Sequence, residues 1–260
     1  MTWASRRRAL YLAVIGGVLF LIAGIPLLVW LYKPPTCFDG RQNQGETAVD
    51  KGGPCAVLDE RTLIPHSVQW SRAFPVRSGS ISAGAHNAVA YIENPNGEAA
   101  VMYAPYAFRL YDPNNVLVAE REGIAFIMPG SITPIFEAGI PTGGRSLTRT
   151  FFEFTAPLVW ERATDMAREI AILGKQARDP STAPRVTAIA ENTSVADARN
   201  VQFVAVVFNP AGNAFAASET VLPLLAAGER RELVFTWPEA FREMVGRIDI
   251  FPVRPPQPAR

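Results

Sequence analysis

The sequence predicts an all-β fold: two tandem β-sandwiches behind one N-terminal transmembrane helix, with short helical connections. Three observations lead to this prediction. Positions 9–32 form an uncharged apolar stretch. After it come short runs of Val, Ile, Phe and Tyr, separated by Asn-Pro, Asp-Pro and glycine-containing turns, as in all-β domains. The same order of landmarks also occurs twice in this part of the chain, which indicates an internal repeat.

The charge balance and the few cysteines and histidines narrow the function classes. The 260 residues carry 25 basic and 24 acidic side chains, for a net charge of +1. A nucleic-acid-binding surface needs a basic excess, so no nucleic-acid partner is expected. With two cysteines and two histidines in the chain, a Cys/His metal cluster is not expected either.

The uncharged stretch is long enough to cross a membrane. Its 24 residues, 9–32, would form a helix about 36 Å long, against a hydrocarbon core of about 30 Å. Arginines occupy positions 6–8 and only Lys33 follows closely, so the positive-inside rule places residues 1–8 in the cytoplasm and the later domains outside. The alternative is a cleaved signal peptide, whose apolar region is shorter, about 7–15 residues. The prediction is a single-pass signal anchor in the cell membrane, with residues 9–32 in contact with lipid.

A polar segment at positions 33–63 follows and is predicted to be a disulfide-closed linker loop. It contains both cysteines, Cys37 and Cys55, in the compartment where disulfides form. A bridge between them would restrict the unfolded loop by about 3 kcal/mol in the loop-entropy model.

The same loop carries a candidate calcium site. Side-chain oxygens recur at spacings of four, three and four residues, in Asp39, Asn43, Glu46 and Asp50. Ca²⁺ takes about six to eight oxygens from such side chains and nearby carbonyls, although the EF-hand pattern is not matched. The alternative is a disulfide-closed polar turn without metal, and no other cofactor is expected.

The spacing of these residues resembles a known motif. The string Cys-x-Asp-Gly-x-x-Asn-x-x-Glu-Thr-x-x-Asp-x-Gly-Gly-x-Cys, from Cys37 to Cys55, is similar to a short cysteine motif near the N-termini of many bacterial surface proteins. That motif normally has two further cysteines, at positions where this chain has Lys51 and Leu58. Their joint absence fits the loss of one whole disulfide, so the resemblance leaves Cys37 and Cys55 as the remaining pair.

The rest of the chain contains two copies of one pattern. Each copy has Glu-Asn, then Asp-Pro or Asn-Pro, then a glycine, at nearly equal spacings. The matched landmarks are Asn94 and Asn192, Asp112 and Asn209, Gly130 and Gly228, and the Phe-Thr-x-Pro runs at 154–157 and 235–238. We therefore expect one β-sandwich repeat at 64–168, a second at 169–254, and a loose proline-rich tail at 255–260.

Each copy is divided further into strands and one short helical piece. Strands are predicted, among others, at Val68–Val76, Ile170–Gln176 and Arg247–Val253. Pro238–Val245 is predicted to be helical, because it has Pro and Glu in its first turn and Gly246 just past its end. The equivalent piece of the first copy, Pro157–Ala167, is expected to be helical as well.

One run in the first copy resembles a domain family. Phe108-Arg109-Leu110-Tyr111-Asp112, with an Asn-Pro after an earlier strand, is similar to the FxLYD-type and late-embryogenesis-abundant-like immunoglobulin-like domains. The second copy has Val206-Val207-Phe208-Asn209 there, a weaker match. The resemblance implies immunoglobulin-like sandwiches of about seven strands. It implies no catalytic residues, because such domains are mostly structural or binding modules.

No catalytic motif is found in the sequence. Gly-x-Ser-x-Gly and phosphate-loop motifs do not occur. His66 and His86 lie near strand starts and are expected at the surface. Asn192-Thr193-Ser194 matches a glycosylation acceptor but sits in a predicted turn.

The function expected is therefore that of a non-enzymatic, membrane-anchored extracytoplasmic accessory or binding protein, within an envelope or secretion assembly. Its partners would be other envelope proteins or surface ligands. The alternative is a ligand-binding or enzymatic module with its site in the groove between the two repeats. A scaffold that oligomerises through the helix is less favoured, because the helix has no Gly-x-x-x-Gly face.

Overall fold

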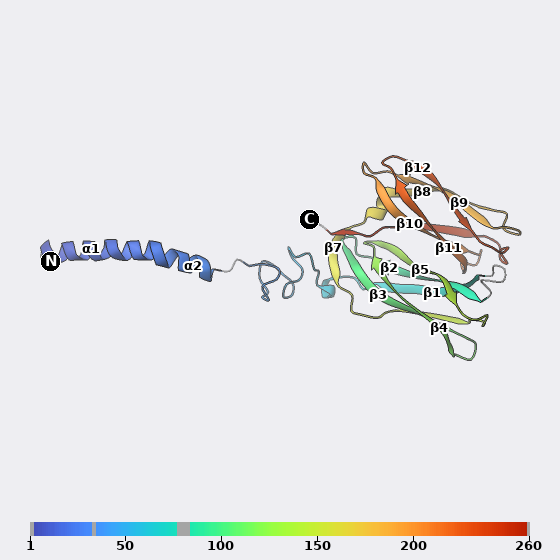
Figure 1. Cartoon of the computed structure of the whole chain (residues 1–260), viewed down its shortest axis with the longest axis horizontal. Coiled ribbons are helices and arrows are strands. Elements are labelled where there is room, and N and C mark those ends of the chain that lie inside the picture. The colour runs from blue at the N-terminus through green and yellow to red at the C-terminus, as the bar shows by residue number, and fades with distance from the viewer. Residues whose placement is uncertain (1–2, 33–34, 77–83, 259–260) are drawn as a thin grey trace. The chain divides into compact units, whose positions relative to one another are not determined.

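The computed structural model describes residues 3–32, 35–76 and 84–258. Lys33, which entered the orientation argument, lies outside these residues. The chain forms two compact units, residues 1–55 and residues 56–260. Figure 1 shows the helix of the first unit and the strands of the second.

The first unit begins with one continuous helical run. It consists of α1 (Trp3–Leu19), a π-helical turn η1 (Phe20–Gly24) and α2 (Ile25–Leu31). Pro26 has no backbone N–H to donate, and the wider π turn ends two residues before it, at Gly24. The helical stretch Trp3–Leu28 is long and apolar enough to span a membrane. Its most apolar 18 residues have a mean hydropathy of 2.4, and none of them is buried.

Seven strands follow in the first repeat, after a short 3₁₀ turn η2 (Glu60–Thr62). They are β1 (Ser67–Val76), β2 (Ala85–Asn94), β3 (Ala99–Tyr111), β4 (Leu117–Ile127), β5 (Ser131–Pro141), β6 (Arg149–Phe154) and β7 (Trp160–Thr164). One antiparallel sheet has the order β1-β2-β5, and in the other β3 pairs with β4, β6 and β7.

The second repeat has the same connectivity. After a 3₁₀ turn η3 (Met166–Glu169) come β8 (Ile170–Arg178), β9 (Arg185–Asn192), β10 (Ala198–Phe208), β11 (Ala214–Leu225), β12 (Arg230–Thr236) and β13 (Arg247–Val253). The sheets have the orders β12-β9-β8 and β11-β10-β13. Strand for strand, β8–β13 pair as β1–β6 do, so the repeat seen in the sequence is a repeat of topology.

Each repeat has its own core between its two sheets. Alternate residues of the central strands point inward and are fully buried, as the period of a strand requires. Phe108 and Leu110 of β3 fill the first core, and Phe203 and Val207 of β10 fill the second. The all-β prediction is confirmed.

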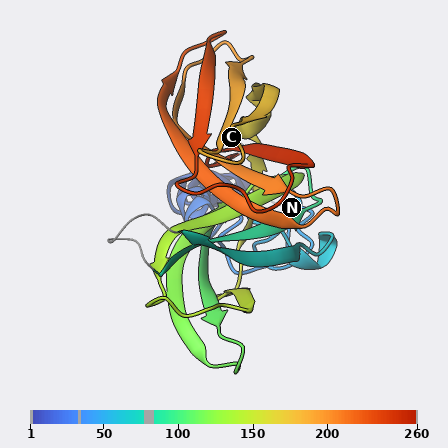
Figure 2. The same ribbon diagram turned by 90° about the vertical axis from the view of Figure 1, so that its right-hand side faces the viewer.

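A third core joins the two repeats. The outer face of the β1-β2-β5 sheet, with Tyr91 and Phe74, packs against Val204, Val206 and Phe208 of β10. Strand β10 is therefore buried on both faces, which explains why residues 203–208 form an unbroken apolar run rather than an alternating one. Figure 2 shows the two repeats, green and orange-red, with their sheets facing each other.

The two predicted helices are wrong. Residues 157–167 contain strand β7, because Trp160 is buried and β7 pairs with the start of β3. Residues 238–245 form bends without a helix. Tertiary hydrogen bonds hold this segment instead: Phe241 N donates to Pro180 O at 2.7 Å and Gly246 N donates to Phe208 O at 2.8 Å. A Cβ at Gly246 would lie 2.6 Å from Pro210 N, so this close approach requires glycine.

Both ends of the second unit contact the first repeat. Leu58 N donates to Trp160 O at 2.8 Å, within the segment expected to be a linker. At the other end, a short strand β14 (Gln257–Pro258) pairs with Thr164 and Ala163 of β7. The described part of the proline-rich tail is therefore hydrogen-bonded rather than loose.

A pair of buried asparagines explains the Glu-Asn landmark. Asn94 Nδ2 donates to Ala99 O at 2.7 Å and to Met128 O at 2.9 Å. Asn192 Nδ2 donates to Leu225 O at 3.0 Å, the equivalent bond to the strand end in the second repeat. Each asparagine therefore connects the end of its own strand, β2 or β9, to the end of β4 or β11 in the other sheet of the same repeat. Asn192 is fully buried, so the glycosylation acceptor is not accessible in the folded chain.

Candidate functional site: the disulfide loop and a pocket between the repeats

The cysteine loop is closed by the expected bridge. Cys37 and Cys55 form a disulfide with an S–S distance of 2.03 Å. Glu46 is buried beside it, and its Oε1 lies 3.2 Å from Cys55 Sγ. The disulfide and this carboxylate form the centre of a loop that has few apolar side chains.

The four candidate calcium ligands lie together. The three carboxylates accept hydrogen bonds from the loop's own backbone N–H groups, whereas Asn43 Oδ1 is buried and has no hydrogen-bond partner among the described residues. Asp50 Oδ1 accepts from the backbone N–H groups of Asp39 (3.1 Å) and Gly40 (3.2 Å). Glu46 Oε2 accepts from the backbone N–H groups of Asn43 and Asp50, both at 3.2 Å. Asn43 Nδ2 donates to Asp39 Oδ2 at 2.8 Å, and this bond lowers the pKa of Asp39.

These bonds give the acidic residues of the loop a structural role that does not itself require a metal. A carboxylate that binds backbone N–H groups replaces the secondary structure that this glycine-rich segment does not form. The calcium site stays a prediction, which a calorimetric titration of the full-length protein with CaCl₂ can test.

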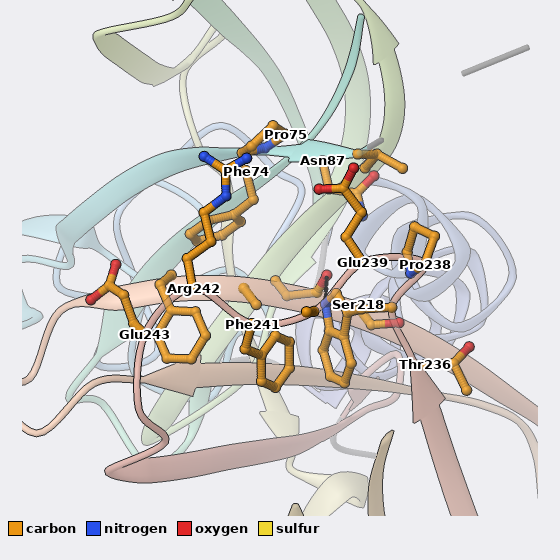
Figure 3. Close-up of a pocket in the computed structure, with 16 residues that line it drawn as sticks. Phe74, Pro75, Asn87, Ser218, Thr236, Pro238, Glu239, Phe241, Arg242 and Glu243 are labelled. Carbon is orange, nitrogen blue, oxygen red and sulfur yellow. Dashed lines mark hydrogen bonds between the residues drawn. The ribbon is translucent and has the colours of Figure 1, made fainter. Parts of the chain in front are cut away.

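A pocket with both apolar and polar lining lies between the two repeats. It is a pocket of about 400 Å³, within the usual range of small-molecule sites, about 300–1,000 Å³. The first repeat contributes Phe74, Pro75 and Val76 of β1 and Asn87 of β2. The second contributes β11 and residues 236–243, within a segment that we call the pocket loop (residues 237–246). Figure 3 shows the pocket.

One wall of the pocket is aromatic. Trp237 and Phe241 have ring centroids 5.1 Å apart, and Phe241 and Phe215 are 5.2 Å apart, both edge to face. Trp237 Nε1 donates to Ala217 O at 3.2 Å, which fixes the indole against β11. All three rings pack on the core of the second repeat yet stay partly exposed, so they offer an apolar surface on a rigid support.

The rim of the pocket is polar and carries both signs of charge. Asn87 Oδ1 accepts from Gly139 N at 2.9 Å, which orients the amide. Glu243 accepts a hydrogen bond from the Asn209 side chain. Glu239 and Arg242 are exposed, and within residues 35–76 and 84–258 neither side chain has a hydrogen-bond or ion-pair partner. Figure 3 shows both extending from the pocket loop toward the strands that carry Pro75 and Asn87.

The surface position expected for the histidines is wrong for His86, whereas His66 is partly exposed. His66 is half-buried between the rings of Phe154 and Trp160, each 5.7 Å away, and this burial lowers its pKa. His86 is buried, and its Nδ1 lies 2.9 Å from Thr142 Oγ1. Both rings therefore pack against the first repeat, which gives each a structural role.

No family model and no curated protein sequence matches this chain. Among solved structures, a β-glucuronidase from Bacteroides uniformis is similar at a TM-score of 0.20 and 10% identity, over 66% of this chain and 27% of that enzyme. The chain thus spans about a quarter of the length of that enzyme. A TM-score this low carries no argument about fold or activity.

The pocket was not predicted residue by residue. Its residues come from positions 74–87 and 215–243, which are far apart in sequence and share no motif. One sequence signal was available. The apolar run of β10 places apolar side chains on both faces of the strand, which indicates that another part of the protein covers its outer face, as the first repeat does.

Proposed function

We propose that this chain is a non-enzymatic, membrane-anchored binding protein whose β-rich unit lies outside the cytoplasmic membrane. The observation that carries the proposal is the N-terminal apolar helix, followed directly by a disulfide-closed loop. Such a helix is stable in lipid because all of its backbone groups bond within it. A structural disulfide is characteristic of an oxidising compartment.

Two further features support binding rather than chemistry. The repeats, which we propose to be immunoglobulin-like, pack through a shared core into one unit that can present a surface rigidly. The pocket between them combines an apolar wall with a polar rim, as ligand sites do. Partners would be envelope components, in an envelope or secretion assembly.

Labelling of the two cysteines tests the topology. We expect a membrane-impermeant maleimide to label Cys37 and Cys55 on intact cells only after reduction, because both are held in the disulfide. The C37S/C55S double variant is the matched control and should stay unlabelled. Labelling that requires permeabilisation of the membrane would place the β-rich unit in the cytoplasm and would end the proposal.

The second candidate function is an enzyme with its active site in the inter-repeat pocket. It is favoured by Glu239 and Glu243, two carboxylates on one pocket rim. A substrate-turnover screen with the full-length protein discriminates the two functions. Turnover that Glu239→Gln abolishes would replace the binding function with an enzymatic one.

A further inference from the structure

We propose that the inter-repeat pocket binds a sugar ring of a neutral glycan. This inference rests on the proposed binding function and names its ligand class. Three properties of the pocket lead to it: its size, its apolar wall, and a rim of planar polar side chains that carries both signs of charge.

The apolar wall suits a ligand that has one apolar face. The C–H groups on one side of a pyranose ring form such a face, and they pack well against aromatic rings. Trp237 and Phe241 supply rings whose orientation is set by the Trp237–Ala217 hydrogen bond and by the edge-to-face contact between them. Because the rings are fixed before a ligand arrives, little conformational entropy is lost on binding.

The rim suits the hydroxyl groups of the same ligand. Asn87, Glu239 and Arg242 end in an amide, a carboxylate and a guanidinium, each of which is planar and has two polar atoms side by side. Such a fork can bond to two adjacent hydroxyls at once, with the carboxylate accepting and the guanidinium donating. The 400 Å³ volume is large enough for one ring of a glycan.

The charge of the rim argues against other ligand classes. Glu239, Glu243 and Arg242 give both signs, so an organic cation over the rings would meet the guanidinium, and an anion would meet two carboxylates. A peptide strand would need a row of backbone donors and acceptors to pair with. The polar groups that distinguish this rim are side chains, which favours a polyhydroxyl ligand.

The conformation of the pocket loop is an independent pointer to the same place. Its sequence has helix start and stop signals, yet tertiary bonds at Phe241 and Gly246 hold it in bends. Places where local preference and tertiary structure disagree are often functional sites. In this conformation the loop turns Phe241 inward while Glu239 and Arg242 project from it, as Figure 3 shows.

The test is glycan binding by the full-length protein in lipid nanodiscs. Isothermal titration calorimetry with neutral mono- and oligosaccharides, together with an array of envelope polysaccharides, separates free sugars from polymer-bound ones as the source. We expect binding by at least one neutral sugar. Glu239→Ala and Arg242→Ala should each weaken it by about 10-fold or more, because each removes charged hydrogen bonds. Both residues are exposed, so the melting temperature should not change.

Two matched controls make the same charge changes elsewhere. Glu122→Ala on β4 and Arg185→Ala on β9 remove exposed side chains outside the pocket and should leave affinity unchanged. Absence of binding by every sugar at about 10 mM, equal affinity in the pocket and control variants, or displacement by a peptide or an organic cation would overturn the assignment. If the cysteine labelling still places the β-rich unit outside, the ligand class fails while the membrane-anchored binding function stands.

Discussion

Val206→Arg is expected to lower the free energy of unfolding by about 4 kcal/mol or more. Val206 is fully buried in the core between the repeats, so an arginine there would lose its hydration without gaining a partner. A loss of this size is a large part of the stability of an ordinary domain, about 5–15 kcal/mol. Thermal unfolding followed by near-ultraviolet circular dichroism measures it, and a change below 1 kcal/mol would contradict the inter-repeat core.

The first repeat offers a matched control for this substitution. Arg109 of β3 is equivalent to Val206, since Asp112 and Asn209 follow each by three residues. Arg109 lies on the outer face, where it bonds Glu120 at 2.7 Å. Arg109→Val removes partly exposed ion pairs, which are each worth about 0–1 kcal/mol, so it should change stability little. A large loss of stability for Val206→Arg with a small change for Arg109→Val would show that the outer face of β10 is buried between the repeats and that of β3 is not.

Asn192→Ala is expected to lower the free energy of unfolding by about 3 kcal/mol. The substitution leaves Ala196 O and Leu225 O without the donor that reaches them at 2.8 and 3.0 Å. It also removes the acceptor of Ser194 N. Leu225 is buried, so its carbonyl keeps the cost of having left water when it loses this partner, which makes the change larger than the mean value of a hydrogen bond. Chemical denaturation of the variant measures the loss.

The same substitution at the equivalent asparagine of the first repeat tests whether these side-chain hydrogen bonds stabilise both repeats. Asn94→Ala should destabilise by a similar amount, because Asn94 makes the same pair of carbonyl contacts in the first repeat. Asn114→Ala, at an exposed turn position, is the control and should have little effect. A small effect at Asn94 with a large one at Asn192 would show that the two buried networks are not equivalent.

The contact between the repeats joins two different faces. The β1-β2-β5 sheet of the first repeat meets the β11-β10-β13 sheet of the second, so the arrangement is head to tail. The face of the first repeat that is equivalent to β10 carries Arg109 with its partners Glu120 and Glu153. These charges replace the apolar contacts at the same positions and disfavour the docking of a further repeat there.

Much of the organisation followed from local patterns. The apolar helix, the short runs of Val, Ile, Phe and Tyr, and the doubled Asn and Asx-Pro landmarks are short-range features, and each corresponds to an element or turn of the structure. The cysteine loop was also foreseen, because both cysteines of the chain lie in one short segment. The candidate pocket was foreseen only as a groove between repeats, since its residues converge from distant positions.

The sequence by itself determined the β class and the repeat, because strand propensity and turn chemistry act within a few residues. The tertiary structure decided which outer faces are buried, that residues 157–167 add a strand, and that the pocket loop is not helical. In each case a partner distant in sequence supplied the deciding contact: β10 covers the first repeat, β3 pairs with β7, and Pro180 O binds Phe241 N. Local helix signals are weak, on the order of 1 kcal/mol each, so such contacts override them.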